Sequence, residues 1–60
     1  MKAKFAVGVR VVVNNCFGLY DHGTVVRVYE KAYEGATQRY LVQFDNEGRE
    51  HCEESELQAE

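Results

Sequence analysis

Two runs of β-branched residues near the start of the chain predict its first two strands. Residues 9–14 place Val9, Val11 and Val13 on one face at period two. Residues 23–30 are apolar almost throughout, which indicates a strand that is bent, or covered on both faces over part of its length. We expect this second strand to be the central one. Residues 14–23, between the two runs, have the Asn, Asp and Gly content of a loop.

A third strand is predicted over residues 38–44, after a polar turn over residues 31–37. Its apolar positions alternate, so that Tyr40, Val42 and Phe44 share one face. The turn that follows contains a glycine, which suits a tight reversal into a fourth strand over residues 49–53. In that fourth strand Cys52 is the apolar member, and we expect it to face the core.

The C-terminal end predicts a single helical turn over residues 55–57, with Leu57 as its buried contact, and residues 58–60 are expected to fray. Short strands joined by Gly-rich and Asn-rich turns close most economically into a bent barrel. We therefore predict one all-β domain over residues 1–60, a small SH3-like barrel of four to five bent antiparallel strands. An open sheet that dimerises edge to edge is the alternative.

The spacing of glycines and apolar residues resembles that of Tudor and related SH3-like barrels. The resemblance covers residues 5–57 and rests on Val7-Gly8-x-x-Val11, Gly23-Thr24-Val25, Tyr40-x-Val42-x-Phe44-Asp45-x-x-Gly48 and Leu57. Barrels of this kind serve as peptide readers, methyl-lysine or methyl-arginine readers, nucleic-acid modules and oligomer building blocks. The resemblance thus implies a fold and leaves several functions open.

The Tudor resemblance implies a cage of aromatic rings around a methylated cation. Phe44 fits the ring at the end of the third strand, and Phe17 or Tyr20 fits the ring from the first loop. Asn46-Glu47 stands where another aromatic residue is expected, and Arg49 stands where an Asn would close the cage. We therefore do not expect a complete methyl-reading cage.

A weaker resemblance is to the plasmid-borne, trimethoprim-resistant type of dihydrofolate reductase, in which four small SH3-like barrels share one pore. It rests on Val-Gly-x-Arg-Val at residues 7–11 and Gly-x-Val at residues 23–25. The Val-Gln-Ile-Tyr run that lines that pore is replaced here by Glu-His-Cys-Glu at residues 50–53. The resemblance therefore implies no reductase activity, but it shows that so small a chain can assemble around a cavity.

Composition changes this picture in two ways. A chain of 60 residues buries a small core and has a thin margin of stability, which favours a homo-oligomer. Seven Lys and Arg residues against ten Asp and Glu give a net charge of −3, and the cations are scattered along the sequence. This distribution argues against nucleic acid as the partner.

The apolar stretch at the start of the chain is soon broken by Gly8 and Arg10, and it is too short for a signal peptide or a membrane span. With an initiator methionine, the sequence predicts a complete cytoplasmic protein that does not contact a membrane. Cys16 and Cys52 are then expected to be free thiols.

The two cysteines and two histidines do not have the spacing of a metal site or a catalytic pair. His51 and Cys52 are adjacent on a strand and so point to opposite faces, whereas zinc ligands come in pairs separated by two to four residues. Cys16 with His22 is the other thiol and base pair, and it lies in no recognisable catalytic context. We expect no enzyme activity, no metal and no cofactor.

The candidate binding site is a shallow aromatic pocket with an acidic rim. Its predicted residues are Phe17, Tyr20, Asp21, Phe44 and Asp45. Such a pocket suits a basic peptide or a cationic small molecule. The competing interpretation is that Phe5, Tyr40 and Phe44 are core residues and the remaining tyrosines lie at the rim.

The leading hypothesis is therefore a non-enzymatic protein- or peptide-binding module that stands alone and self-associates. One alternative is an oligomeric enzyme or small-ligand binder whose pocket forms between subunits. Another is a nucleic-acid accessory protein, which requires Lys2, Lys4, Arg10 and Arg27 to gather on one face.

Overall fold

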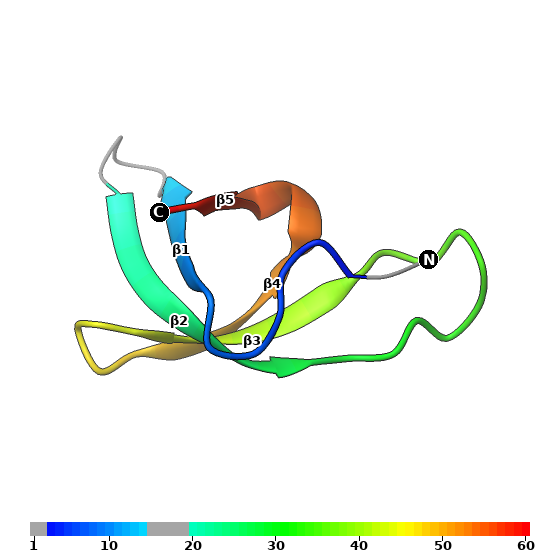
Figure 1. Ribbon diagram of the computed structural model, residues 1–60, viewed down its shortest axis with the longest axis horizontal. Coiled ribbons are helices and arrows are strands. Elements are labelled where there is room, and N and C mark those ends of the chain that lie inside the picture. The colour runs from blue at the N-terminus through cyan, green and yellow to red at the C-terminus, as the bar shows by residue number, and fades with distance from the viewer. Residues whose placement is uncertain (1–2, 15–19) are drawn as a thin grey trace.

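The computed structural model describes residues 3–14 and 20–60, and its regular secondary structure consists of strands apart from one 3-10 turn (Figure 1). The elements in chain order are β1 (Arg10–Asn14), β2 (Tyr20–Val28), β3 (Arg39–Phe44), β4 (Arg49–Glu53), a 3-10 turn (Glu54–Glu56) and β5 (Leu57–Ala59). They form one antiparallel sheet in the order β4-β3-β2-β1-β5. The predicted all-β class and the central place of the second strand are confirmed.

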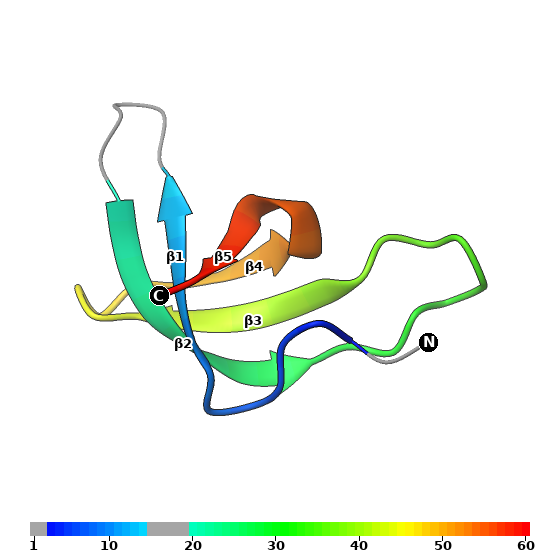
Figure 2. The same ribbon diagram turned by 45° about the horizontal axis from the view of Figure 1, so that its top comes forward.

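The sheet curls into a half-barrel because β2 pairs with β1 over its first half and with β3 over its second. The register between β2 and β3 shifts between Val25 and Arg27, which places a β-bulge at Val26. A bulge bends its strand and increases the local twist. The curvature of β2 is visible in both views (Figures 1 and 2). The bend predicted for this strand is confirmed, and the curled sheet is compatible with a small SH3-like barrel.

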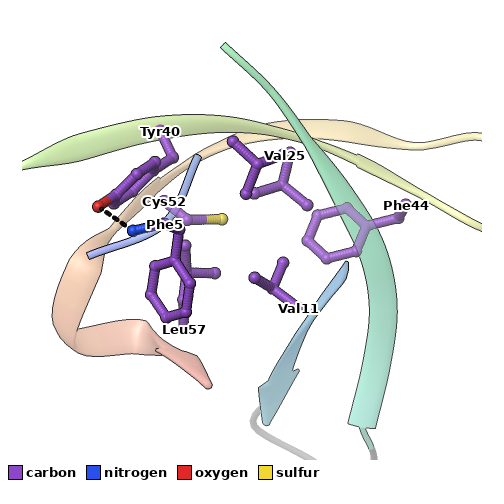
Figure 3. Close-up of a cluster of buried hydrophobic side chains, with 8 residues drawn as sticks. Phe5, Val11, Val25, Tyr40, Phe44, Cys52 and Leu57 are labelled. Carbon is purple, nitrogen blue, oxygen red and sulfur yellow. Dashed lines mark hydrogen bonds between the residues drawn. The ribbon is translucent and has the colours of Figure 1, made fainter. Parts of the chain in front are cut away.

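The core lies inside this curl and draws buried side chains from every strand, three of them from β3, and one from the N-terminal segment (Figure 3). Its buried members are Phe5, Val11, Val25, Tyr40, Val42, Phe44, Cys52 and Leu57. Val9 and Val13 are partly buried against it. The alternation predicted for the first, third and fourth strands is confirmed, as is the burial of Cys52 and Leu57.

Gly23 is buried where β2 crosses from β1 to β3. A β-carbon at this position would lie 2.7 Å from Val42 Cγ1 and 2.8 Å from the Gln43 carbonyl oxygen. Because only glycine leaves this space empty, Gly23 allows the two strands to approach at the tightest part of the curl.

The C-terminal prediction is wrong at its last step. Residues 58–60 were expected to fray, but Leu57 to Ala59 form β5, which pairs with β1 from Val13 to Val11. The Glu60 N–H also donates to the Arg10 carbonyl oxygen at 3.2 Å. The physical reason is that β1 would otherwise present an unpaired edge.

Two element boundaries also differ from the prediction. The helical turn is present, but it covers Glu54–Glu56 and so begins one residue earlier than expected. The loop predicted over residues 14–23 is too long at its end, because β2 already begins at Tyr20 and residues 20–22 pair with β1. Tertiary pairing here overrides the low strand propensity of Asp21 and of the glycine that follows. Within the described residues, no helix has the length and apolar character that crossing a membrane requires.

Candidate functional site

A groove of about 840 Å³ lies between the β2–β3 loop and the first described residues of the chain. Both ribbon views show this loop extending away from the curled sheet (Figures 1 and 2). The groove is lined by Ala3, Val28, Tyr29, Glu30, Lys31, Tyr33, Glu34, Gly35 and Gln38. We refer to it as the loop groove.

Hydrogen bonds at its base and tip hold the loop in shape. At the base, the Tyr29 N–H donates to the Arg39 carbonyl at 3.1 Å, and Gln38 Nε2 donates to the Tyr29 carbonyl at 2.5 Å. At the tip, the Ala36 N–H donates to the Tyr33 carbonyl at 3.0 Å. Gly35 has a φ of +92°, a conformation that glycine adopts without strain. The sequence therefore encodes a closed turn that presents Tyr33.

The groove combines an aromatic face with negative charge. Tyr33 is 70% exposed, and Glu30 and Glu34 beside it are also exposed. Neither carboxylate forms an ion pair with another described residue. Lys31 is the one cation among the lining residues. An aromatic face with unpaired carboxylates attracts a cationic side chain.

The predicted pocket residues are only partly described by the structure. Phe17 and the side chain of Tyr20 lie outside the described part of the chain. Phe44 is 7% exposed and belongs to the core, so little of its ring reaches the surface. Asp21 is half-buried on β2, and the Asp45 N–H donates to the carbonyl of the adjacent His22 at 2.9 Å. The backbones of Asp21 and Asp45 therefore lie near each other in space. The aromatic pocket itself stays a prediction.

The carboxylate of Asp45 is engaged by Arg10. Arg10 donates to both oxygens of Asp45, at 2.8 and 2.6 Å, and also to Glu60 at 3.0 Å and Thr24 at 3.0 Å. Hydrogen bonds to Asp45 and then to Glu60 raise the pKa of Arg10, and the Arg10 hydrogen bond lowers the pKa of Asp45. His22 Nδ1 lies 2.8 Å from Glu60 Oε2. In this cluster of Arg10, His22, Asp45 and Glu60, the one arginine contacts both carboxylates.

Cys52 and His51 point to opposite faces of β4, as the alternation predicted. Burial, followed by the nearby carboxylates of Glu56 and Glu50, raises the pKa of the Cys52 thiol to about 11. A thiol with that pKa is protonated at neutral pH and is a poor nucleophile. Within residues 3–14 and 20–60, no three His, Cys, Asp or Glu side chains gather into a metal site. Cys16 lies outside the described residues.

The loop groove was missed because residues 31–37 were interpreted only as a polar connection. A signal was present in the sequence, since a Tyr-Glu pair occurs at residues 29–30 and again at residues 33–34.

The chain matches no protein-family model, and comparison with curated proteins and with solved structures likewise finds no match.

Proposed function

We propose that this chain is a non-enzymatic binding module that takes a basic peptide segment of a partner protein in the loop groove. The observation that carries the proposal is the exposed ring of Tyr33 beside the carboxylates of Glu30 and Glu34, which form no ion pair with the residues that the structure describes. A Lys or Arg side chain gains from both the ring face and the carboxylates. Val28 and Ala3 supply an apolar surface for its methylene stem.

The chemistry is the one that the sequence predicts for the first loop, an aromatic surface with an acidic rim. The groove is in the size range of ligand sites, which run from about 300 to 1,000 Å³. The net charge of −3 adds a long-range attraction for a basic segment. The surface of Phe17, Tyr20, Asp21, Phe44 and Asp45 is the second location at which such a segment can bind.

The test is fluorescence anisotropy with a labelled peptide in which lysines alternate with apolar residues, at low ionic strength. Glu30→Gln with Glu34→Gln is expected to weaken binding by about three- to tenfold, because each exposed charge contributes about 0.2–1 kcal/mol. Tyr33→Ala is expected to weaken it by a similar factor. Glu47→Gln is the matched control, since it removes one exposed carboxylate from the β3–β4 turn outside the groove.

An affinity that the groove variants leave unchanged contradicts the groove as the binding site. In that case Phe17→Ala with Tyr20→Ala tests the second location. If both sets of variants bind the peptide like the unaltered chain, or if the peptide does not bind at all, the proposal of a basic-peptide module fails.

Self-association is part of the same proposal. Val7 is 64% exposed and Val26 is 37% exposed, and exposed apolar side chains on a small domain favour contact with another copy. Light scattering at micromolar concentration is expected to show a species larger than the 6.9 kDa chain. A strict monomer would contradict self-association and would also remove a pocket shared between subunits.

A further inference from the structure

The outer face of β2, β3 and β4 gathers cations that are far apart in the sequence. Because Tyr40, Val42, Phe44 and Cys52 point into the core, the residues that alternate with them point outward. The register groups these outward residues into three rows that run across the three strands. The first row is Thr24, Gln43 and Arg49, the second is Arg27, Leu41 and His51, and the third is Tyr29, Arg39 and Glu53. We call these nine positions the outer face.

The ring of Tyr29 crosses this face. Its backbone pairs with Arg39 on β3, yet its ring centroid is 5.4 Å from that of His51 on β4, and its hydroxyl lies 3.1 Å from His51 Nε2. On the other side, the guanidinium carbon of Arg27 is 5.6 Å from the same ring. Tyr29, Arg39 and His51 together line a shallow hollow of about 370 Å³. The neighbouring rings of Tyr29 and His51 therefore lie among the side chains of Arg27 and Arg39 on this face.

Within the described part of the chain, the arginines of the outer face form no ion pair. Arg10, on β1, holds two carboxylates, whereas Arg27, Arg39 and Arg49 form no ion pair with a described carboxylate. Arg49 Nε donates instead to the neutral Gln43 Oε1 at 2.9 Å. Three arginines against Glu53 give the outer face a charge of 3 − 1 = +2, with His51 counted as neutral, in a chain whose net charge is −3.

We propose that the outer face binds single-stranded nucleic acid. Arg27 and Arg39 contact phosphates, and the planes of His51 and Tyr29 stack against unpaired bases, which is how single strands are held on charged sheets with aromatic side chains. The interleaving favours nucleic acid over an acidic peptide, because a peptide of carboxylates makes no use of ring faces. Arg27 and Arg39 lie outside the lining of the loop groove, whereas Tyr29 belongs to both, so this site adjoins the proposed peptide site and differs from it in its arginines.

Direct binding to a labelled oligo(dT) and to an oligo(U) of the same length, followed by anisotropy at low ionic strength, tests this proposal. Arg27→Gln with Arg39→Gln is expected to weaken binding at least tenfold. It is also expected to make the slope of log affinity against log salt shallower by about 1.4, since each phosphate contact contributes about 0.7 for single strands. His51→Ala is expected to weaken binding about fivefold or more and to leave the salt slope unchanged, because stacking releases no counterions.

Lys31→Gln is the matched control, since it removes one positive charge from the loop groove instead of the outer face. It is expected to change the affinity less than twofold. Circular dichroism of each variant checks that the fold is retained, and binding of the lysine-rich peptide by the Arg27 and Arg39 variant checks that the loop groove is unaffected.

Three results would overturn the proposal. One is the absence of measurable binding to either oligonucleotide at low salt. Another is an equal loss of affinity in Lys31→Gln and in the variant with both arginines replaced, which would indicate that binding depends only on the overall charge of the protein. The third is tighter binding of a poly-glutamate of equal charge, which would assign the outer face to an acidic protein segment.

Discussion

Tyr40 and Phe5 are joined twice across the core. Their rings meet edge to face, with centroids 5.6 Å apart and planes at 73°, and the Phe5 N–H donates to the Tyr40 hydroxyl oxygen at 3.2 Å (Figure 3). The same hydroxyl donates to Glu54 Oε2 at 2.5 Å. These contacts fix the N-terminal segment over the core, where Phe5 is 5% exposed. One side chain on β3 thus connects the start of the chain with the 3-10 turn.

Replacing Tyr40 by Phe is expected to destabilise the protein while leaving the ring contact in place. The Phe5 N–H is then buried without an acceptor, and such a group costs about 1–3 kcal/mol. Urea denaturation measures the loss as a lower midpoint at an unchanged slope. Glu54→Gln is the control, because its amide oxygen still accepts a hydrogen bond from the Tyr40 hydroxyl. This variant is expected to lose less stability than Tyr40→Phe. Equal stability of Tyr40→Phe and the unaltered chain would contradict this role.

Gly23→Ala is expected to be among the most damaging single changes in the sheet. The added methyl group would lie 2.8 Å from the Gln43 carbonyl oxygen, which is backbone and cannot rotate away. Overpacking of this kind costs about 1–3 kcal/mol, measured by thermal or urea unfolding. Gly48→Ala is the control, since its methyl group would meet only the side-chain oxygen of Asn46 at 3.0 Å. Equal stability of the two variants would contradict the close approach of β2 and β3.

The strands and the core were predictable because their signal is local. Alternation at period two placed Tyr40, Val42 and Phe44 in the core, and the β-branched run placed Val11 there. The 3-10 turn was likewise visible from Leu57 and its polar neighbours. Each of these predictions depends on residues that are close together in the sequence.

What sequence reasoning missed depends on pairing between distant segments. Strand β5 exists because β1 offers an edge, and nothing in residues 57–59 alone indicates a strand. The cations expected to gather for a nucleic-acid partner were Lys2, Lys4, Arg10 and Arg27. Lys2 lies outside the described residues, and the sheet register brings Arg27 together with Arg39 and Arg49, which sequence reasoning did not include. Register is set by the whole sheet, and a shift of one residue would turn each of these side chains to the other face.

Stability is expected to fall at alkaline pH because of Cys52. Burial raises the pKa of this thiol in the folded chain to about 11, above its ordinary value of 9.0. A group whose folded pKa is raised contributes stability that is present below the unfolded pKa and is lost as the pH rises through the folded pKa. The free energy of unfolding, measured by urea titration, should therefore decline between pH 9 and about 11.

Cys52→Val replaces the titrating group by a side chain of similar size. The free energy of unfolding of this variant is expected to decline less than that of the unaltered chain just above pH 9. Tyr40, whose pKa burial also raises, adds a loss that begins only above its ordinary value of 10.0 and remains in the variant. A decline from pH 9 that is as steep in Cys52→Val as in the unaltered chain would exclude the thiol as its cause.

The loss of stability at acid pH is expected to depend on Arg10. Its hydrogen bonds lower the pKa of Asp45 and, together with those of His22, the pKa of Glu60, below their ordinary values of 3.8 and 4.5. Carboxyls with a lowered folded pKa contribute stability above those values, and this stability is lost as the pH falls through the folded pKa. Arg10→Gln should therefore be less stable than the unaltered chain at neutral pH, and the two should converge as the pH falls below about 4 in urea titrations.

Arg27→Gln is the matched control for this prediction, because it removes the same charge from a side chain that has no carboxylate partner among the described residues. The free energy of unfolding of Arg27→Gln should stay parallel to that of the unaltered chain across the acid range. The carboxyls whose pKa values are lowered, those of Asp45, Glu54 and Glu60, keep their hydrogen-bond partners in this variant. The contribution of Arg10 comes from exposed ion pairs and should shrink with added salt, whereas the contribution of the buried Tyr40 hydroxyl should not. Curves for Arg10→Gln and the unaltered chain that stay equally far apart down to the acid limit would show that the Arg10 cluster does not produce the acid dependence.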